Sequence, residues 1–205
     1  MRNYPRSLAM VLIGCSLCGA ASAADKEQRA FEITGLLGYR GGGDFDELEG
    51  PANPNIEPDT SYGFALGWHS TPQTRYELLY DLQQTDIQDL GVDLDVEHLH
   101  LGGTATFGDS TGAEPYIAGG IGATRLKPSV GDDETRFSIS IGFGVEVPVN
   151  ERLGLRLEAR GYLVSMSSDS EIFCASGASG GTCLVRAAGD TMFQYSLLGG
   201  IGLKF

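Results

Sequence analysis

Eight segments of about ten residues alternate apolar and polar side chains with a period of two, and this pattern constrains the fold more than any other feature of the sequence. Successive side chains of a β-strand point to opposite faces, so the alternation predicts strands with one apolar and one polar face. The segments span residues 30–41, 61–70, 75–85, 96–107, 115–126, 135–147, 153–165 and 192–205. No run after residue 23 approaches the roughly 20 continuous apolar residues that a membrane-spanning helix requires. We therefore expect an all-β fold.

The segment at residues 135–147 shows the pattern most clearly. Its apolar positions are Phe137, Ile139, Ile141, Phe143, Val145 and Val147, and its polar positions include Arg136, Ser138, Ser140 and Glu146. Strands of this kind and number are typical of a small transmembrane barrel, in which a charged side chain facing lipid costs roughly 2 to 4 kcal/mol near the midplane. The apolar face must therefore point outward, and the polar face must line the interior. A soluble β-sandwich would instead turn its apolar faces inward.

The links between the segments alternate in length, which gives a second argument for the same fold. Long links at 42–60, 86–95, 127–134 and 166–191 alternate with short ones at 71–74, 108–113 and 148–152. Outer-membrane barrels have long outside loops and short periplasmic turns. We therefore predict an eight-stranded antiparallel up-and-down transmembrane β-barrel in the bacterial outer membrane, with both termini in the periplasm.

The first 23 residues have the features of a cleaved signal peptide. Arg2 and Arg6 give a basic start, an apolar run covers 8–17, and Ala21-Ser22-Ala23 offers the small residues of a cleavage site. Residues 24–205 would then form the barrel domain. The alternative is a lipoprotein signal, because residues 12–15 end in Cys15 and resemble the site at which lipoproteins are cut and acylated. That alternative adds a lipid anchor and leaves the fold unchanged.

The sequence is strongly acidic, with a formal charge of −13 that becomes −15 when the signal is removed. This balance excludes nucleic acid as a partner, because phosphate contacts need clustered Lys and Arg. The long links hold most of the net charge, through Asp44, Asp46, Glu47, Glu49, Glu57, Asp59, Asp86, Asp89, Asp93, Asp95, Asp132, Asp133 and Glu134. We expect a solvated acidic surface. The alternative is a site for Ca²⁺ or a cationic partner, and divalent ions could bridge these acids to lipopolysaccharide phosphates.

Two cysteines remain after the signal, Cys174 and Cys183 in the longest link. An even pair in an exported chain predicts a disulfide.

The expected interior face carries many charged side chains. They are Glu32, Arg40, Arg75, Glu77, Asp81, Arg136, Glu146, Arg156, Glu158 and Arg160. The interior of an eight-stranded barrel is just wide enough for side chains, and buried charges persist only when they are paired and hydrogen-bonded. We therefore predict an ion-paired network that plugs the lumen. A narrow path for small solutes is the alternative.

We expect no catalytic, cofactor or metal site. His98 and His100 share a face at a spacing suited to metal ligands, but no third ligand follows at a recognisable spacing. Adjacent His69 and Ser70 point to opposite faces of a strand, so they cannot form a serine–histidine pair.

The final residues, Tyr195-Ser196-Leu197-Leu198-Gly199-Gly200-Ile201-Gly202-Leu203-Lys204-Phe205, have apolar residues at every second position and an aromatic end. Together with Pro115-Tyr116-Ile117-Ala118-Gly119-Gly120-Ile121-Gly122, this strand resembles the small outer-membrane β-barrel family that includes the OmpA transmembrane domain and the OmpX/Ail group. The resemblance implies assembly by the barrel-assembly machinery, which reads the terminal Phe205, and contact with outer-membrane lipid and lipopolysaccharide.

Functions in that family include adhesion, serum resistance, small-molecule passage and lipid A modification, and the fold does not choose among them. We expect a monomeric structural barrel with a plugged polar lumen, whose acidic loops meet a host or envelope ligand. The alternatives are a narrow solute channel and a lipid A-modifying enzyme.

Overall fold

The structure is a computed structural model that describes residues 30–43, 45–47, 56–87, 92–107, 112–166, 171–177, 180–187 and 191–205. For residues 45–47, 171–177 and 180–187 it describes the backbone alone. The predicted signal peptide, its cleavage site and Cys15 lie outside the described residues, and so do Asp44, Glu49 and Asp89.

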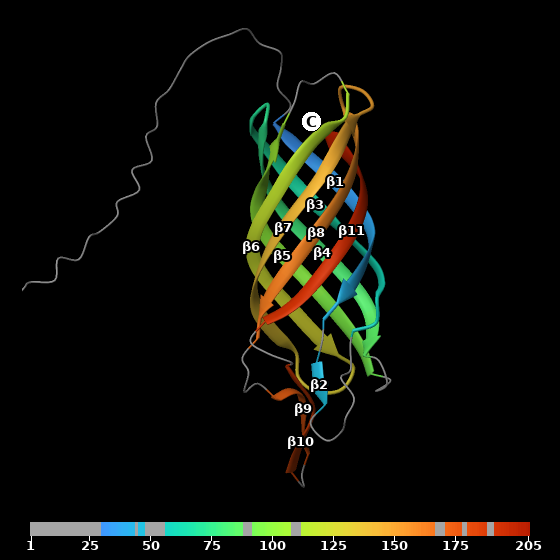
Figure 1. The fold of residues 1–205 in the computed structure, drawn as a ribbon, viewed down its shortest axis with the longest axis vertical. Helices are drawn as coiled ribbons and strands as arrows, with labels where there is room; N and C mark the ends of the chain where they lie inside the picture. The colour runs from blue at the N-terminus through green and yellow to red at the C-terminus, as the bar shows by residue number, and fades with distance from the viewer. Residues whose placement is uncertain are drawn as a thin grey trace, which may run out of the picture.

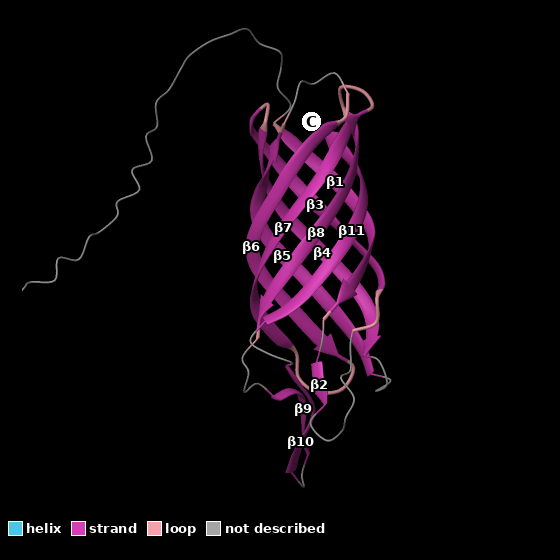
Figure 2. Cartoon of the chain, in the orientation of Figure 1, coloured by secondary structure: helices cyan, strands magenta, loops and turns pink. Residues whose placement is uncertain are grey.

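Eight antiparallel strands form a closed barrel, in which each strand pairs with its neighbours in sequence and β1 pairs with β11 to close the ring (Figure 1). They are β1 (Phe31–Gly42), β3 (Asp59–Thr71), β4 (Thr74–Ile87), β5 (Val92–Thr106), β6 (Glu114–Pro128), β7 (Glu134–Pro148), β8 (Leu153–Ser165) and β11 (Thr191–Lys204). The described residues contain strands and loops and no helix (Figure 2), and therefore no helix that could cross a membrane. The predicted fold is confirmed.

Three further strands lie beyond the barrel end that is opposite the termini (Figure 1). They are β2 (Phe45–Glu47), β9 (Glu171–Gly177) and β10 (Gly180–Ala187), and they form a separate sheet in the order β2-β10-β9. The sequence analysis treated these segments as loops. We call this end of the barrel the loop end and the other the terminus end.

The barrel strands are also longer at the loop end than the sequence analysis predicted. The link expected at 86–95 contracts to 88–91, because β4 continues to Ile87 and β5 begins at Val92. The strands contain 12 to 15 residues, whereas a tilted strand needs only about 9 to 11 to cross a bilayer. Regular structure therefore continues past the lipid at the loop end.

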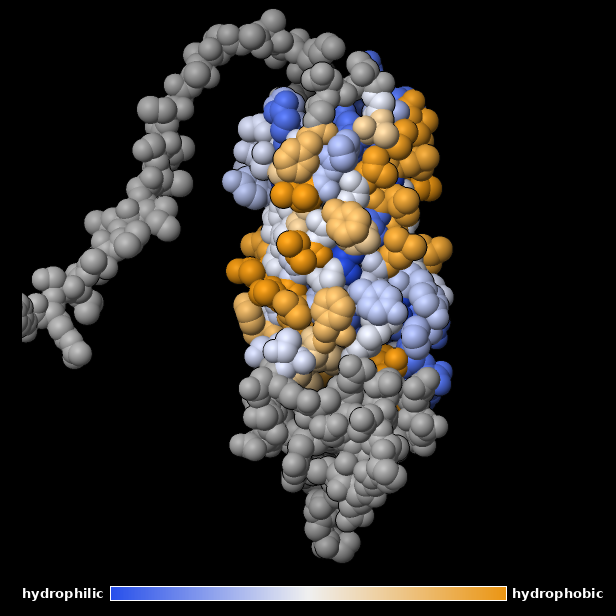
Figure 3. Space-filling model, viewed as in Figure 1, coloured by the Kyte–Doolittle hydropathy of each residue, from blue (hydrophilic) through white to orange (hydrophobic). Residues whose placement is uncertain are grey.

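The barrel wall is apolar on its outside, and apolar side chains cover much of the face shown in Figure 3. Aromatic side chains gather at two levels. Phe31, Trp68 and Tyr76 lie at the terminus end, and Tyr39 and Tyr62 lie toward the loop end. Two aromatic girdles that flank an apolar band are the usual outer surface of a membrane barrel.

Two of the short links are tight turns at the terminus end. Thr71 Oγ1 accepts hydrogen bonds from the backbone N–H groups of Gln73 and Thr74, and Asn150 Oδ1 does so from those of Arg152 and Leu153. Such side-chain acceptors stabilise turns because they satisfy backbone donors that the ladder leaves unpaired.

Candidate functional site in the barrel interior

The structure places nine of the ten predicted interior charges in buried positions inside the barrel; the tenth, Arg136, is only half-buried. Arg136 lies toward the loop end, where its guanidinium forms an ion pair with Glu134 at 2.7 Å. The nine buried charges come from the four strands β1, β4, β7 and β8 and meet in three groups.

The central group is a ring in which two acids alternate with two arginines. Glu77 lies 2.6 Å from Arg156 Nη1 and 3.0 Å from Arg160 Nη2, and Glu158 lies 2.5 Å from each arginine. Tyr116 completes the ring, since its hydroxyl donates to Glu158 at 2.6 Å and accepts from Arg156 Nε at 2.7 Å. Every charge in the ring has an opposite partner, which offsets the cost of removing it from water.

A second group of ion pairs lies in the interior at the terminus end. Arg75 Nη1 lies 2.7 Å from Glu32 and 3.1 Å from Glu146, and its Nη2 reaches Glu77 at 3.6 Å, which joins this group to the ring. Lys204 adds a bond to Glu146 at 2.7 Å.

His69 also joins this group, through its Nε2 at 3.2 Å from Glu32. Neither His69 nor Lys204 is among the interior charges predicted from the sequence. Lys204 follows Gly202 on the inner face of β11, so the alternation of side chains along this strand predicts that Lys204 points inward.

A third group lies nearer the loop end, where the fully buried Arg40 forms an ion pair with Asp81. Arg40 also donates to Ser196 Oγ at 3.1 Å and to the carbonyl of Val96 at 3.2 Å. The hydroxyl of Tyr162 donates to the same aspartate at 3.2 Å. Arg40 thereby connects β1 with β4, β5 and β11 across the lumen.

His98 and His100 are buried among polar side chains, and the imidazole of His98 stacks on the ring of Tyr162 with the centroids 4.0 Å apart. The two ring nitrogens of His98 lie 2.7 Å from Thr124 Oγ1 and 3.2 Å from Gln194 Oε1.

The ring nitrogens of His100 lie 2.8 Å from the hydroxyls of Ser138 and Ser140. All four ring nitrogens are therefore in hydrogen bonds, and the two histidines are part of the buried polar network. Within the described residues no group of three or more His, Cys, Asp or Glu has the arrangement of a metal site.

A cluster of buried apolar side chains lies in the interior at the loop end, and we call it the apolar cap. It comprises Ile56, Ile87, Val92, Leu94, Val96, Leu126, Val164, Met166 and Met192, all buried. The cap is not predicted by the alternation pattern, because that pattern gives every strand a polar inner face. A signal was present in β5, where Val92, Leu94 and Val96 alternate with acids.

Ile56 enters the cap from the first long link rather than from a barrel strand. It pairs with Ile87 across an isolated bridge, and its N–H donates to the carbonyl of Gly43 at 3.0 Å. Gly43 has a φ of 104°, and a Cβ there would collide with Ile56, so glycine suits both the backbone and the contact. Ile56 is thus held against the strands that form the barrel mouth.

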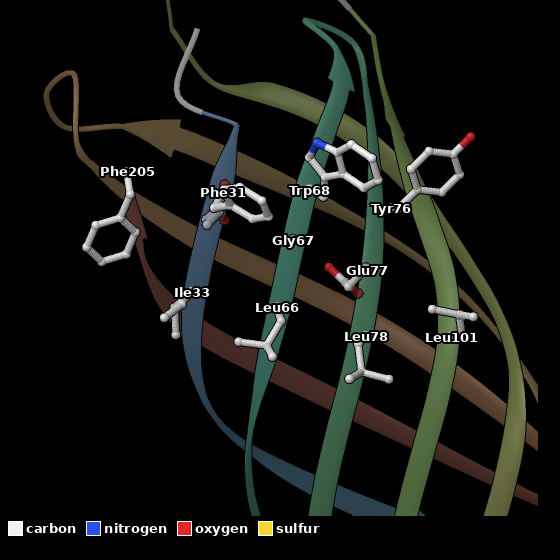
Figure 4. Close-up of a pocket in the computed structure, with 11 residues that line it drawn as sticks. Phe31, Ile33, Leu66, Gly67, Trp68, Tyr76, Glu77, Leu78, Leu101 and Phe205 are labelled. Atoms are coloured by element: carbon white, nitrogen blue, oxygen red, sulfur yellow. The ribbon is translucent and has the colours of Figure 1, made fainter.

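The outer surface has a hollow at the terminus end, lined by Leu66, Trp68 and Tyr76 (Figure 4). Phe31 and Phe205 lie on its other side, and the backbone N–H of Phe205 donates to the carbonyl of Phe31 at 2.8 Å. The ring of Phe205 is 59% exposed on the outside of the seam between β1 and β11. Phe205, the residue that the resemblance assigns to assembly, is therefore held in place by a backbone hydrogen bond while its side chain is accessible.

Cys174 on β9 and Cys183 on β10 are directly opposite each other in the strand register. Opposed residues of antiparallel strands have Cα separations that overlap those of disulfides. Their side chains lie outside the described part of the structure, so the disulfide stays a prediction.

Acidic side chains gather at the loop end. Glu57, Asp59, Asp86, Asp93, Asp132 and Asp133 are exposed there. Asp46 and Glu47 belong to β2, for which only the backbone is described.

The family model of the outer membrane protein beta-barrel domain matches residues 10–201. No curated protein matches the chain. Among solved structures, Neisserial surface protein A is 14% identical, with a TM-score of 0.58 over 85% of this chain and 97% of that one. The outer membrane protein AlkL is 12% identical, with a TM-score of 0.57 over 92% and 97%. OprG from Pseudomonas aeruginosa is 16% identical, with a TM-score of 0.53 over 85% and 95%. At these identities the likeness concerns the fold.

Proposed function

Since the chain belongs to the outer membrane protein beta-barrel domain family of the bacterial outer membrane, we propose that it is a closed, non-conducting barrel that displays an acidic surface outside the cell. In this proposal the barrel is a rigid support, and the interaction takes place at the loop end.

The observation that carries the proposal is that the interior is filled at two levels by different chemistry. The central ring of Glu77, Arg156, Glu158 and Arg160 spans the lumen within the membrane, and the apolar cap fills it at the loop end. A charged network and a dry apolar constriction both oppose the passage of ions. The ring and the cap follow each other along the lumen, so an ion would have to pass both, and each of them alone would hinder conduction.

The proposed orientation has the termini in the periplasm and the loop end outside. Two features support it: the extra β2-β10-β9 sheet lies at the loop end, and the tight turns of β3–β4 and β7–β8 lie at the terminus end. Short periplasmic turns and longer external connections are the rule in such barrels.

The partner at the loop end would be cationic, or an anionic surface bridged by divalent ions, such as lipopolysaccharide. The exposed acids of β3, β4 and β5 just beyond the lipid band, such as Asp59, Asp86 and Asp93, support this chemistry. A non-enzymatic role is part of the proposal. It is supported by the inward direction of His69, His98 and His100, because lipid-modifying chemistry would need polar groups on the lipid-facing wall.

We also propose that the chain works as a monomer and that the barrel-assembly machinery recognises its last strand through Phe205. The exposed ring of Phe205 at the barrel seam supports recognition of this residue.

The experiment that tests non-conduction is single-channel recording of the refolded protein in planar bilayers. We expect no conductance from the parent protein. A variant with Arg156, Glu158 and Arg160 all changed to alanine removes the ring, and a second variant adds Ile56→Ser to open the cap. Because the ring and the cap follow each other along the lumen, openings are expected to be rare in the first variant and frequent in the second.

A matched control is Ile56→Ser alone, which leaves the ring intact and should stay closed. Steady conductance of the parent protein would overturn the proposal and favour a narrow solute channel.

A further inference from the structure

Four buried polar atoms with unused hydrogen-bonding capacity lie at the boundary between the polar interior and the apolar cap. Ser61 Oγ, Asp81 Oδ1 and Gln83 Oε1 have no hydrogen-bond partner among the described residues, and the contact of Arg40 Nη2 is its ion pair with Asp81 Oδ2, which leaves one of its two N–H groups available. Each belongs to a side chain with no exposed surface. A buried polar group left without a partner costs about 1 to 3 kcal/mol, so three of them beside a partly satisfied guanidinium call for an explanation.

The strand register brings the four side chains together. Ser61 on β3 is directly opposite Gln83 on β4, and Asp81 lies two residues away on the same face of β4. Arg40 is ion-paired with Asp81, and its backbone carbonyl accepts a hydrogen bond from Gln83 Nε2 at 3.1 Å.

The remaining bonds of these side chains leave specific atoms available. Tyr162 donates to Asp81 Oδ2, which leaves Oδ1, and Gln83 Nε2 donates to the carbonyls of Arg40 and Glu57, which leaves Oε1. Asp81 Oδ1 and Gln83 Oε1 can only accept, whereas Arg40 Nη2 can only donate and the hydroxyl of Ser61 can donate.

We propose that Arg40, Ser61, Asp81 and Gln83 form a binding site for one internal water molecule. A water molecule donates two hydrogen bonds and accepts up to two, so the two acceptors and two donors match its capacity, and buried waters typically make two to four such bonds. A cation could be bound by the two acceptors and by the oxygen of Ser61, but it would leave the N–H of Arg40 Nη2 without an acceptor. It would also add charge beside Arg40, which already balances the carboxylate of Asp81.

The site explains how the interior changes from polar to apolar without unpaired groups. It holds the Arg40–Asp81 pair against the underside of the cap, and it does so whether or not the lumen conducts. The inference is therefore independent of the proposed function.

The direct test is heteronuclear NMR of the refolded, isotope-labelled parent protein in lipid nanodiscs, with water itself as the probe. We expect cross-relaxation from a long-lived water to the side-chain amide of Gln83 and the β protons of Ser61. Absence of that transfer, under conditions where exposed hydroxyls exchange normally, overturns the site.

A Ser61→Ala variant gives a second test, in which the direction of the change in stability decides. If the hydroxyl binds water, its removal raises the unfolding equilibrium constant by about 2- to 10-fold, as expected for one lost hydrogen bond. If the hydroxyl were merely unpaired, its removal would leave stability unchanged or raise it, and this result would overturn the proposal.

Two serine controls set the scale of this measurement. Ser138 makes hydrogen bonds to His100 and Thr124, so Ser138→Ala gives the cost of a bonded hydroxyl. Ser165 is exposed at the end of β8, so Ser165→Ala gives the effect of the substitution alone. Should Ser61→Ala fail to fold, the NMR experiment on the parent protein decides.

Discussion

The interior of the barrel contains two cores of opposite chemistry, built by the same strands. On β5, Val92 and Leu94 point inward at the loop end while Asp93 points outward; further along, His98 points inward while Leu99 faces lipid. The alternation continues without a break, and only the polarity of the two faces is exchanged. Lipid requires an apolar outer wall and leaves the inner wall to polar groups, whereas water outside the bilayer restores the arrangement of a soluble protein.

The two cores should also differ in how much stability the protein loses when their side chains are substituted. An apolar core loses stability in proportion to the atoms removed, because the loss is one of burial and packing. A buried ionic core loses little when it is replaced as a whole but a great deal when one partner is removed, since the other charges stay behind unpaired. Single substitutions in each core can test this contrast.

Glu77→Leu should have the largest effect. It leaves Arg156 and Arg160 each without one of its two acids, and removal of one partner from a buried pair costs about 3 to 5 kcal/mol. Urea unfolding in lipid vesicles, followed by the fluorescence of the single tryptophan, Trp68, measures the loss. Asp93→Asn, on the exposed outer face of β5, is the matched control and should change stability little. A Glu77→Leu protein as stable as the parent would show that the ring is not an interdependent unit.

Leu94→Ala in the apolar cap should have a smaller but still large effect. Leu94 is 1% exposed, and truncation of a buried leucine costs about 2 to 5 kcal/mol according to how far the cavity collapses. The lower part of this range applies, because Met166 and Met192 in the same cluster have flexible side chains that can fill part of the cavity. The same change at Leu101, which is 64% exposed to lipid, is the control and should cost less. Equal losses at the two sites would contradict the idea that the cap is a packed core.

The fold could be predicted from the sequence because lipid imposes one simple rule on all eight strands. The segment predicted at 153–165 coincides with β8 (Leu153–Ser165). The segment predicted at 96–107 differs from β5 (Val92–Thr106) by four residues at its start. There the acids Asp93 and Asp95 occupy the outer face, which the lipid rule assigns to apolar residues. The rule does not apply past the bilayer, so the sequence analysis assigned the end of the strand to a loop.

The interior site could be predicted only in part. Alternation indicates which side of the wall a side chain occupies, and this placed Glu77, Arg156 and Arg160 inside. Which charges meet depends on how far the strands are staggered around the barrel, and a single sequence carries no direct signal for the stagger. Ile56 gave no signal either, because a lone apolar residue in a Pro-containing link has no periodicity.

Asp133→Asn should have the smallest effect and tests whether location, rather than ion pairing itself, makes the ring sensitive. Arg125 and Asp133 form an ion pair at 2.7 Å, close to the 2.6 Å between Arg156 and Glu77, but their side chains are 48% and 45% exposed. Water and salt screen such a pair, so its loss should cost less than about 1 kcal/mol, and added salt should reduce the difference further. The Trp68 unfolding assay in vesicles at low and high salt measures both effects. A loss as large as that of Glu77→Leu would mean that the loop end depends on its charges as strongly as the membrane-embedded lumen does, and the contrast between the two cores would no longer hold.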